Sequence, residues 1–236
     1  MSEYSGHENL TMMVSCHNFN NWMYQEILPG LKGDILEIGS GLGVFSEKII
    51  HDFPNSSITL SEISTKYVAD LRNKFSQKRV TICKLDLNKK EDYEQIGYEK
   101  FDSIFALNVL EHVENDTFAL KQLYQMLRPD GNLIILVPCH KFLYNVIDHQ
   151  VAHFRRYTEK ELVQKIQSSN FKILKTFQFN MLGILGWYVN GNILKNSSVN
   201  NSATKVFDKI IPIERIFEKI LTKKIGLSVI CFATKS

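Results

Sequence analysis

The chain lacks a strong excess of one charge. Its 236 residues include 28 Lys and Arg against 25 Asp and Glu, which gives a formal net charge of +3. A protein whose main task is to coat nucleic acid normally has a clear basic excess, because contacts to phosphate need Lys and Arg. The composition therefore disfavours nucleic acid as a partner and favours small molecules.

Long apolar runs and paired cysteines are missing too. The longest apolar stretch, residues 181–189, is far shorter than the roughly 20 residues that span a bilayer. The four cysteines form no C-x-x-C pair, and the N-terminal segment MSEYSGHENL has no apolar signal core. We therefore expect a cytoplasmic protein with reduced thiols and without stable membrane insertion.

Strand-like runs instead alternate with helical patterns along most of the chain. Strands are expected near residues 34–38, 57–62, 79–84, 101–106, 132–137, 173–179 and 227–233, and helices at 43–52, 65–75, 115–127 and 158–168. This alternation is typical of an α/β fold, with a mostly parallel sheet covered by helices on both faces. We predict one domain over residues 1–236, divided into an N-terminal helical cap (1–32), a cofactor-binding core (33–138) and a substrate-side segment with helical lid elements (139–236).

A glycine-rich turn follows the first expected strand. The segment DILEIGSGLGVF, residues 34–45, has glycine at every second position: Gly39, Gly41 and Gly43. Such a turn, opening onto a helix, lets the backbone approach a nucleotide-like ligand. Dinucleotide sites typically use G-x-G-x-x-G, and the position of the last glycine is Val44 here. The spacing therefore predicts a nucleotide-like ligand and disfavours a nicotinamide enzyme, which we keep as an alternative.

Polar residues end the next three strands. Glu62, nineteen positions after Gly43, can accept hydrogen bonds from both hydroxyls of a ribose. Asp86 in CKLDLN can accept from an exocyclic amine such as that of adenine, and Asn108 and Val109 end the fourth strand. Ligands of open α/β sheets bind outside the carboxyl ends of the strands. Each acid alone is better explained as a helix cap, but their joint placement after successive strands predicts an adenosine-like ligand.

The set of motifs resembles the class I S-adenosylmethionine-dependent methyltransferases over about residues 18–138. The matching segments are LEIGSGLG, Glu62, Asp86, FDSIFALNVLEHV and LRPDGNLIILVP. The resemblance implies a Rossmann-like, doubly wound sheet of seven strands with the last antiparallel, and S-adenosyl-L-methionine as the cofactor. It also implies that Glu37 or the nearby backbone contacts the methionine end. The predicted cofactor-binding residues are Trp22, Glu37, Gly39, Ser40, Gly41, Gly43, Glu62, Ile63, Asp86, Leu87, Asn108 and Val109.

Trp22 belongs to this set because related enzymes often use an N-terminal helix as a lid over the cofactor. The helical pattern around it carries Ile27 and Leu28, which we expect to face the core.

The segment DHQVAHFRRYTEKEL, residues 148–162, holds the densest group of reactive side chains. It follows the fifth strand, so it can fold over the methyl-donor site, and it resembles the H-F/Y-R-R-Y segment of a methyltransferase subgroup. We predict His153 as a general base, Tyr157 as a catalytic residue that orients the acceptor, and Arg155 and Arg156 as ligands of a carboxylate or phosphate.

Structural roles are also expected within this segment. Two adjacent arginines cannot both point into one site from regular structure, so at least one is expected to pair with Glu159 or Asp148. His149 and His153 lie four residues apart without a third ligand, so no metal site is predicted. His112 and Glu111 in LEHV are interpreted as a structural histidine and a helix cap.

Residues 205–224 contain six basic and three acidic residues, a net charge equal to that of the whole chain. Ile213, Ile216, Phe217 and Ile220 form an apolar stripe at helical spacing, which we expect to pack on the domain or to line the acceptor pocket. A homodimer contact, or a reversible membrane-surface contact suited to a lipid-linked substrate, is the alternative.

These observations predict an enzyme that methylates an oxygen or nitrogen of a small molecule, either a metabolite or a natural-product intermediate. A macromolecular acceptor is disfavoured, because the fourth strand ends in NVLEHV and not in the Asn/Asp-Pro-Pro-Tyr/Phe signature of enzymes that methylate bases. The sequence also leaves open a lipid-linked acceptor and a non-catalytic S-adenosylmethionine-binding module.

Overall fold

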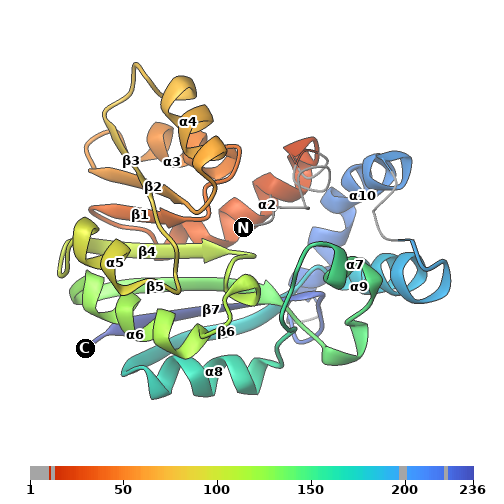
Figure 1. The fold of residues 1–236 in the computed structure, drawn as a ribbon. Coiled ribbons are helices and arrows are strands. Elements are labelled where there is room, and N and C mark those ends of the chain that lie inside the picture. The colour runs from red at the N-terminus through yellow and green to blue at the C-terminus, as the bar shows by residue number, and fades with distance from the viewer. Residues whose placement is uncertain (1–10, 12–13, 197–200, 221–222) are drawn as a thin grey trace.

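The computed structural model describes residue 11 and residues 14–196, 201–220 and 223–236. Its centre is a seven-stranded sheet in the order β3-β2-β1-β4-β5-β7-β6 (Figure 1). The strands are β1 (Ile35–Ile38), β2 (Ile58–Glu62), β3 (Val80–Lys84), β4 (Phe101–Leu107), β5 (Leu127–Pro138), β6 (Phe171–Phe179) and β7 (Ser228–Lys235). Strand β7 runs antiparallel to β5 and β6, whereas β1 to β5 pair in parallel. The predicted fold class is confirmed.

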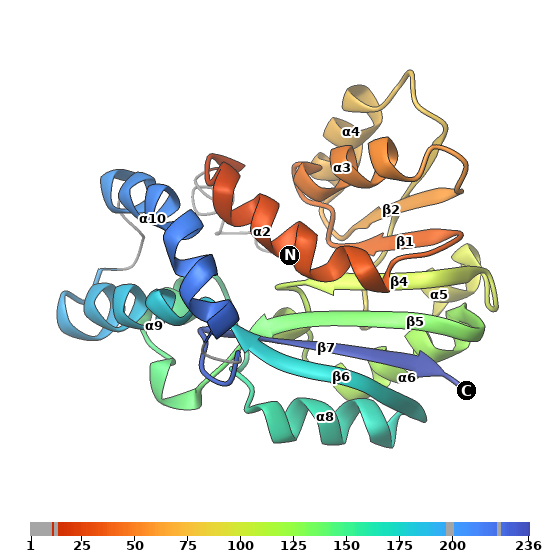
Figure 2. The ribbon, with the colours of Figure 1, turned by 180° about the vertical axis from the view of Figure 1, so that it is seen from behind.

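Helices cover both faces of the sheet (Figures 1 and 2). The longer ones are α2 (His17–Ile27), α3 (Val44–Asp52), α4 (Thr65–Lys74), α5 (Lys90–Ile96), α6 (Asp116–Met126), α8 (Glu159–Ser168), α9 (Met181–Trp187) and α10 (Asn201–Ile220). The shorter ones are α7 (Val146–Gln150), the 3-10 turns η1 (Leu28–Gly30), η2 (Leu110–His112) and η3 (Lys141–Leu143), and the π-helix η4 (Tyr188–Ile193).

Local chemistry explains where several helices begin. Thr158 forms a capping box with Glu161 at the start of α8, and Ser64 and Asn115 accept main-chain N–H groups at the starts of α4 and α6. Gly43 starts α3 in a left-handed conformation, at φ +75°. The chain can therefore turn from β1 into α3 within a few residues.

Two apolar clusters separate the faces of the sheet. Strand residues alternate between them: Leu36 packs with α5, α6 and α8, and Ile35 packs with α2, α3 and α4. Ile27 is fully buried and Leu28 packs against the second cluster, as predicted for the N-terminal helix. The helices hold the sheet from both sides and leave the carboxyl ends of β1 to β4 for the loops that follow them.

The prediction that the apolar stripe of the C-terminal helix packs on the domain is wrong, whereas its alternative role in lining the acceptor pocket stays a prediction. Ile213, Ile216 and Phe217 on α10 are 57–63% exposed. The buried face instead carries Glu214 and Glu218, which accept the main-chain N–H groups at the start of α9. Those N–H groups have no partner within their own helix, so they draw the two carboxylates inward and turn the apolar stripe outward. The side chain of Ile220 lies outside the described residues.

Within the described residues, no helix is long and apolar enough to cross a membrane.

Candidate active site

Four strand ends meet at one edge of the sheet. Strands β3, β2, β1 and β4 are neighbours in parallel register, so the residues that follow them lie side by side. Gly39 follows β1, Glu62 ends β2, Asp86 follows β3 and Asn108 follows β4. The sheet order thus brings together residues that the sequence separates by up to 69 positions.

The glycine turn has a bare backbone that a side chain would obstruct. Gly39, Gly41 and Gly43 have φ angles of +71°, +52° and +75°, a region that residues with a Cβ rarely adopt. A Cβ on Gly39 would lie 2.5 Å from Cγ2 of Val109. The turn therefore requires glycine for its conformation and for its packing against the residue after β4.

Glu62 points at this turn. Its carboxylate accepts the N–H of Gly41 and the N–H of Ser64, both at 3.0 Å. Each carboxylate oxygen has two lone pairs, so both can accept one further hydrogen bond. This is the arrangement that two adjacent ribose hydroxyls need.

Glu37 lies behind the turn with only 2% of its surface exposed. Burial raises the pKa of Glu37 to about 7, despite the hydrogen bond that its carboxylate accepts from Ser46 on α3. Burial therefore favours the neutral carboxyl group over the carboxylate more than water does.

The remaining predicted cofactor residues have varied surroundings. Asp86 caps its own turn by accepting the N–H of Asn88 at 3.0 Å, Leu87 is buried, and Ile63 is 54% exposed. Asn108 has a positive φ of +53°, which is uncommon for a residue with a Cβ. Trp22 is packed in the core, with its ring 4.8 Å from that of Phe179. Its predicted contact with the cofactor stays a prediction.

The turn and its neighbours fit an adenosyl ligand. The three glycines of the turn have positive φ angles and no side chain, so a ligand can approach the backbone there. The Glu62 carboxylate, which can accept further hydrogen bonds, faces this turn. Asp86 and Asn108 end the flanking strands. An adenosyl group at this edge would therefore meet groups suited to its ribose and its base.

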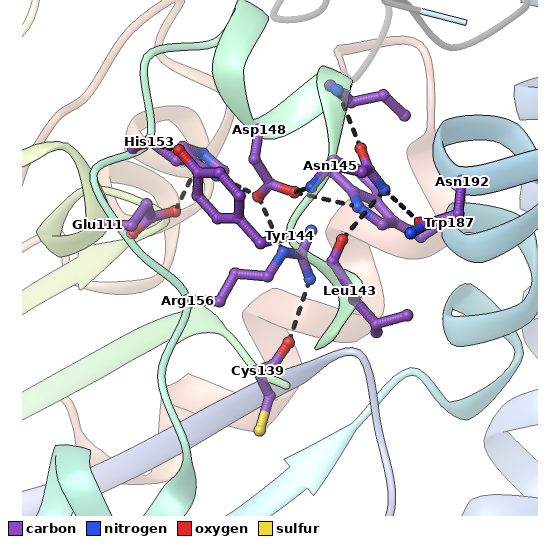
Figure 3. Close-up of polar contacts among 11 residues, drawn as sticks. Glu111, Cys139, Leu143, Tyr144, Asn145, Asp148, His153, Arg156, Trp187 and Asn192 are labelled. Atoms are coloured by element: carbon purple, nitrogen blue, oxygen red, sulfur yellow. Dashed lines mark hydrogen bonds and ion pairs between the residues drawn. The ribbon is translucent and has the colours of Figure 1, made fainter. Parts of the chain in front are cut away.

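On the acceptor side, Asp148 is the centre of a buried polar network (Figure 3). Its carboxylate accepts from Nδ1 of His153 and Nε of Arg156, both at 2.8 Å. Weaker bonds come from the N–H of Asn145 at 3.1 Å and Nε1 of Trp187 at 3.3 Å. Burial alone would raise the pKa of Asp148, but the bonds from His153 and Arg156 lower it below its usual value. Asp148 is therefore an anion that fixes the His153 ring.

Arg156 is one of the two adjacent arginines and is almost completely buried. It pairs with Asp148, donates to the carbonyl of Cys139 and stacks on the ring of Trp187. The expectation that one arginine forms a structural salt bridge to Asp148 is confirmed. The predicted role of Arg156 as a substrate ligand stays a prediction.

A second network surrounds Asp116 at the start of α6. Its carboxylate accepts from Arg155, Lys165 and the hydroxyl of Tyr157, at 2.7–2.8 Å. Burial would raise the pKa of Asp116, yet these three donors lower it. Tyr157 is only 1% exposed, and burial raises the pKa of its hydroxyl. In this arrangement the hydroxyl acts as a donor to Asp116.

Glu111, His112 and His153 form a third group beside the end of β4. His153 Nε2 lies 3.8 Å from Oε1 of Glu111, and the His112 and His153 ring centroids are 4.6 Å apart. Burial raises the pKa of Glu111 to about 7 and lowers that of His112 to about 4. Sequence reasoning set both residues aside as structural. Their place at the end of β4, next to Asn108, was the signal that could have identified them.

His149, the other histidine of the segment, is exposed. Its ring packs edge-on against Tyr144 at 4.9 Å.

Known proteins resemble this chain in sequence and in fold. A family model described as a methyltransferase domain matches residues 36–133. The chain is 29% identical over 149 residues to malonyl-[acyl-carrier protein] O-methyltransferase 2 of Ilyobacter polytropus, covering 60% of this chain and 55% of that protein. It is also 29% identical over 168 residues to probable polyketide synthase 40 of Dictyostelium discoideum, covering 62% of this chain and 7% of that protein. The chain thus spans about half of the first relative and a small part of the second.

A solved structure shares the fold of this chain. The S-adenosylmethionine-dependent methyltransferase of Mesorhizobium loti superposes with a TM-score of 0.63 at 16% identity, covering 91% of this chain and 97% of that one. The glycine turn, the strand order and the matched segment agree with one another. The chain therefore carries a class I S-adenosylmethionine-dependent methyltransferase domain.

Proposed function

We propose that the protein transfers the methyl group of S-adenosylmethionine to an oxygen or nitrogen of a small-molecule acceptor. The observation that carries this proposal is the carboxylate of Glu62, which hydrogen-bonds the N–H of Gly41 at the glycine turn. It supports a ribose site beside a backbone that has no side chain in the way. When bound there, S-adenosylmethionine supplies an electrophilic methyl group on a sulfonium.

The protein's part in the reaction is to position the acceptor. Methyl transfer is an in-line displacement, so much of the rate comes from holding the acceptor atom near the methyl carbon. We assign the acceptor-binding part of the site to the residues that follow β4 and β5. His153 presents Nε2 because Nδ1 is held on Asp148, so the group formed by Glu111, His112 and His153 would hold the acceptor atom.

An oxygen of an acyl-linked acid is the acceptor we favour. The first relative is named as an O-methyltransferase of a malonyl group on a carrier protein, and the second as a polyketide synthase. Arg155 keeps 29% of its side chain exposed although it pairs with Asp116, so it could contact an acceptor carboxylate. Arg156 is buried and is assigned a positioning role.

Calorimetry with S-adenosylmethionine tests the cofactor site. Gly41→Val should abolish binding, because its side chain would fill the ligand's space at a positive φ. Gly186→Ala is the matched control, since a Cβ at Gly186 meets nothing within 4 Å. Binding of NAD in place of S-adenosylmethionine would contradict the proposal.

Transfer is tested with radiolabelled S-adenosylmethionine and a panel of acyl thioester acids, alcohols and amines. The expected result is a labelled methyl group bound to an oxygen or nitrogen of one acceptor class. Binding without transfer across the whole panel would favour a non-catalytic module.

A lipid-linked acceptor is the second candidate, because α9, η4 and α10 expose apolar side chains. These are Leu185, Tyr188, Val189, Ile193, Leu194, Val206, Ile210, Ile213, Ile216 and Phe217. Co-sedimentation with anionic phospholipid vesicles tests this candidate, and it fails if the protein stays in the supernatant at low salt.

A further inference from the structure

We propose that Glu111, His112 and His153 form a binding site for a divalent transition-metal ion of the Zn²⁺ type. Each residue offers one ligand atom, and these atoms lie within 4.8 Å of one another. Glu111 and His112 belong to η2, directly after β4, whereas His153 follows α7. The fold therefore brings together ligands from two segments about 40 residues apart, which the spacing of His149 and His153 could not suggest.

Glu111 gives the first independent sign of a ligand. Its side chain is 0% exposed, and neither carboxylate oxygen has a hydrogen-bond partner among the described residues. Nε2 of His153 is 3.8 Å from Oε1 of Glu111, which is too long for a hydrogen bond. A buried carboxylate without a partner is costly, and a bound cation would remove that cost.

The partners of the two histidines give the second sign. In metal sites, a ligating histidine almost always donates its other ring N–H to a carboxylate, a carbonyl or water. Nδ1 of His153 lies 2.8 Å from Asp148, and main-chain groups of Val151 and Ala152 hydrogen-bond the His112 ring. Asp148 is itself held by Arg156 at 2.8 Å. Both rings are thus oriented before any ion arrives.

The ligand types select the metal. Two imidazoles and a carboxylate are a known ligand set of catalytic Zn²⁺ sites, which keep one position open, whereas Mg²⁺ and Ca²⁺ prefer oxygen ligands. With bonds of about 2.1 Å, a tetrahedral ion needs its ligand atoms about 3.4 Å apart. The 3.8 Å between His153 and Glu111 is therefore wider than ideal by about 0.4 Å, and the outer bound of 4.8 Å for the three ligand atoms is wider by about 1.4 Å, so side-chain rotations must bring the ligands closer to the ion. His112 and His153 are partly exposed, so an ion can enter.

This inference rests on the proposed function for its chemical role. The open position of the ion would hold the acceptor oxygen near the methyl carbon. An acid acceptor is already ionised at neutral pH, whereas an alcohol acceptor would have the pKa of its hydroxyl lowered and would release its proton to water. The oxygen would then form a bond to the methyl carbon while the carbon–sulfur bond breaks, and the electron pair of that bond would stay on sulfur. His153 then acts as a metal ligand and not as the general base predicted from the sequence.

The test is calorimetric titration of chelator-treated protein with ZnCl₂, repeated with CoCl₂ while visible absorption is recorded. The wild-type chain should bind one equivalent of each ion. Glu111→Gln and His153→Ala should each lose more affinity than the roughly 10- to 100-fold that removal of an outer partner costs, and Asp148→Asn should fall within that range. His149→Ala, which removes an exposed histidine of the same segment, should bind as the wild type does.

X-ray absorption on the zinc-loaded wild-type protein provides a measurement that does not depend on the folding of a variant. It should show nitrogen and oxygen ligands at about 2.0–2.2 Å, with two imidazoles. No binding of either ion, or binding unchanged in Glu111→Gln and His153→Ala, overturns the metal site.

Methyl transfer and cofactor binding separate this inference from the proposed function. If the protein transfers labelled methyl groups in the presence of chelator and binds no ion, the metal site fails and the proposed function stands. If one zinc ion binds but no acceptor is methylated, the metal site stands and the proposed function fails. S-adenosylmethionine affinity should be the same in Glu111→Gln and wild type.

Discussion

Asp148→Asn should destabilise the folded protein by about 3–5 kcal/mol. Asp148 and Arg156 form an ion pair whose side chains are 0% and 1% exposed, with Oδ1 and Nε at 2.8 Å. Asparagine keeps the shape but removes the charge, so the guanidinium of Arg156 loses its buried counter-ion. One carboxylate oxygen also becomes an NH₂ group, which cannot accept the bonds that now come from His153, Asn145 or Trp187.

Urea denaturation at neutral pH, followed by circular dichroism, measures the free energy of unfolding of this variant. Asp70→Asn is the control, because Asp70 is an exposed acid on α4 and its replacement should change stability by less than about 0.5 kcal/mol. In a double-mutant cycle, adding Arg156→Met to Asp148→Asn should recover part of the loss, since the uncompensated charge is then gone. A loss below about 1 kcal/mol for Asp148→Asn, or additive losses in the cycle, would refute the reasoning.

Two further predictions follow from carboxylates elsewhere in the fold. Glu62→Gln should weaken S-adenosylmethionine binding by about 10- to 100-fold in calorimetry, because charged hydrogen bonds are worth roughly 1.5–3 kcal/mol, and unchanged affinity would exclude a ribose contact. Burial raises the pKa of Glu218 from 4.5 to about 7 in the folded protein. The folded state therefore binds a proton more tightly than the unfolded state, which stabilises the fold fully below about pH 4.5, and this stabilisation is lost as the pH rises through about 7. As the pH rises from about 4 to about 8, the free energy of unfolding of Glu218→Gln should therefore increase by about 3 kcal/mol relative to that of the wild type. A difference between the two proteins that does not change with pH in urea denaturation would contradict this prediction.

The fold was largely predictable because the sheet is buried on both faces. Strands covered by helices on both sides appear in the sequence as short apolar runs bounded by turns, so β1 to β7 were all located, although β5 begins five residues earlier than predicted, at Leu127 and not at residue 132. The short helices α5, α7 and α9 were missed, since each has five to seven residues and too few positions to show a helical period.

The error on α10 has a specific cause. An amphipathic pattern shows that a helix has two different faces, but not which of them meets the protein. Glu214 and Glu218 face inward because the start of α9 presents unpaired N–H groups to them. That demand arises from a tertiary contact and is invisible in the sequence of either helix.

Sequence patterns predicted those contacts of the site that follow from the strand order. They did not predict the contacts that depend on how the loops and helices pack. The approach of Glu62 to the glycine turn follows from the parallel order of β1 and β2. The surroundings of Arg155, Arg156 and Tyr157 depend on Asp116 and Asp148, and pairing across segments cannot be read from spacing. The approach of His153 to Glu111 is likewise a contact between distant segments, so the sequence spacing did not reveal it.

Three buried carboxylates at the acceptor edge show where the chemistry of this site is concentrated. Asp148 is compensated by Arg156 and the His153 ring, and Asp116 by Arg155 and Lys165. Burial is comparable in all three, so charge compensation is what distinguishes them. Glu111 is the member of this set whose oxygens receive no hydrogen bond within the described part of the chain, and it lies next to Asn108 at the end of β4. A fold that satisfies two buried acids with arginine and leaves the third unsatisfied favours a ligand at the third.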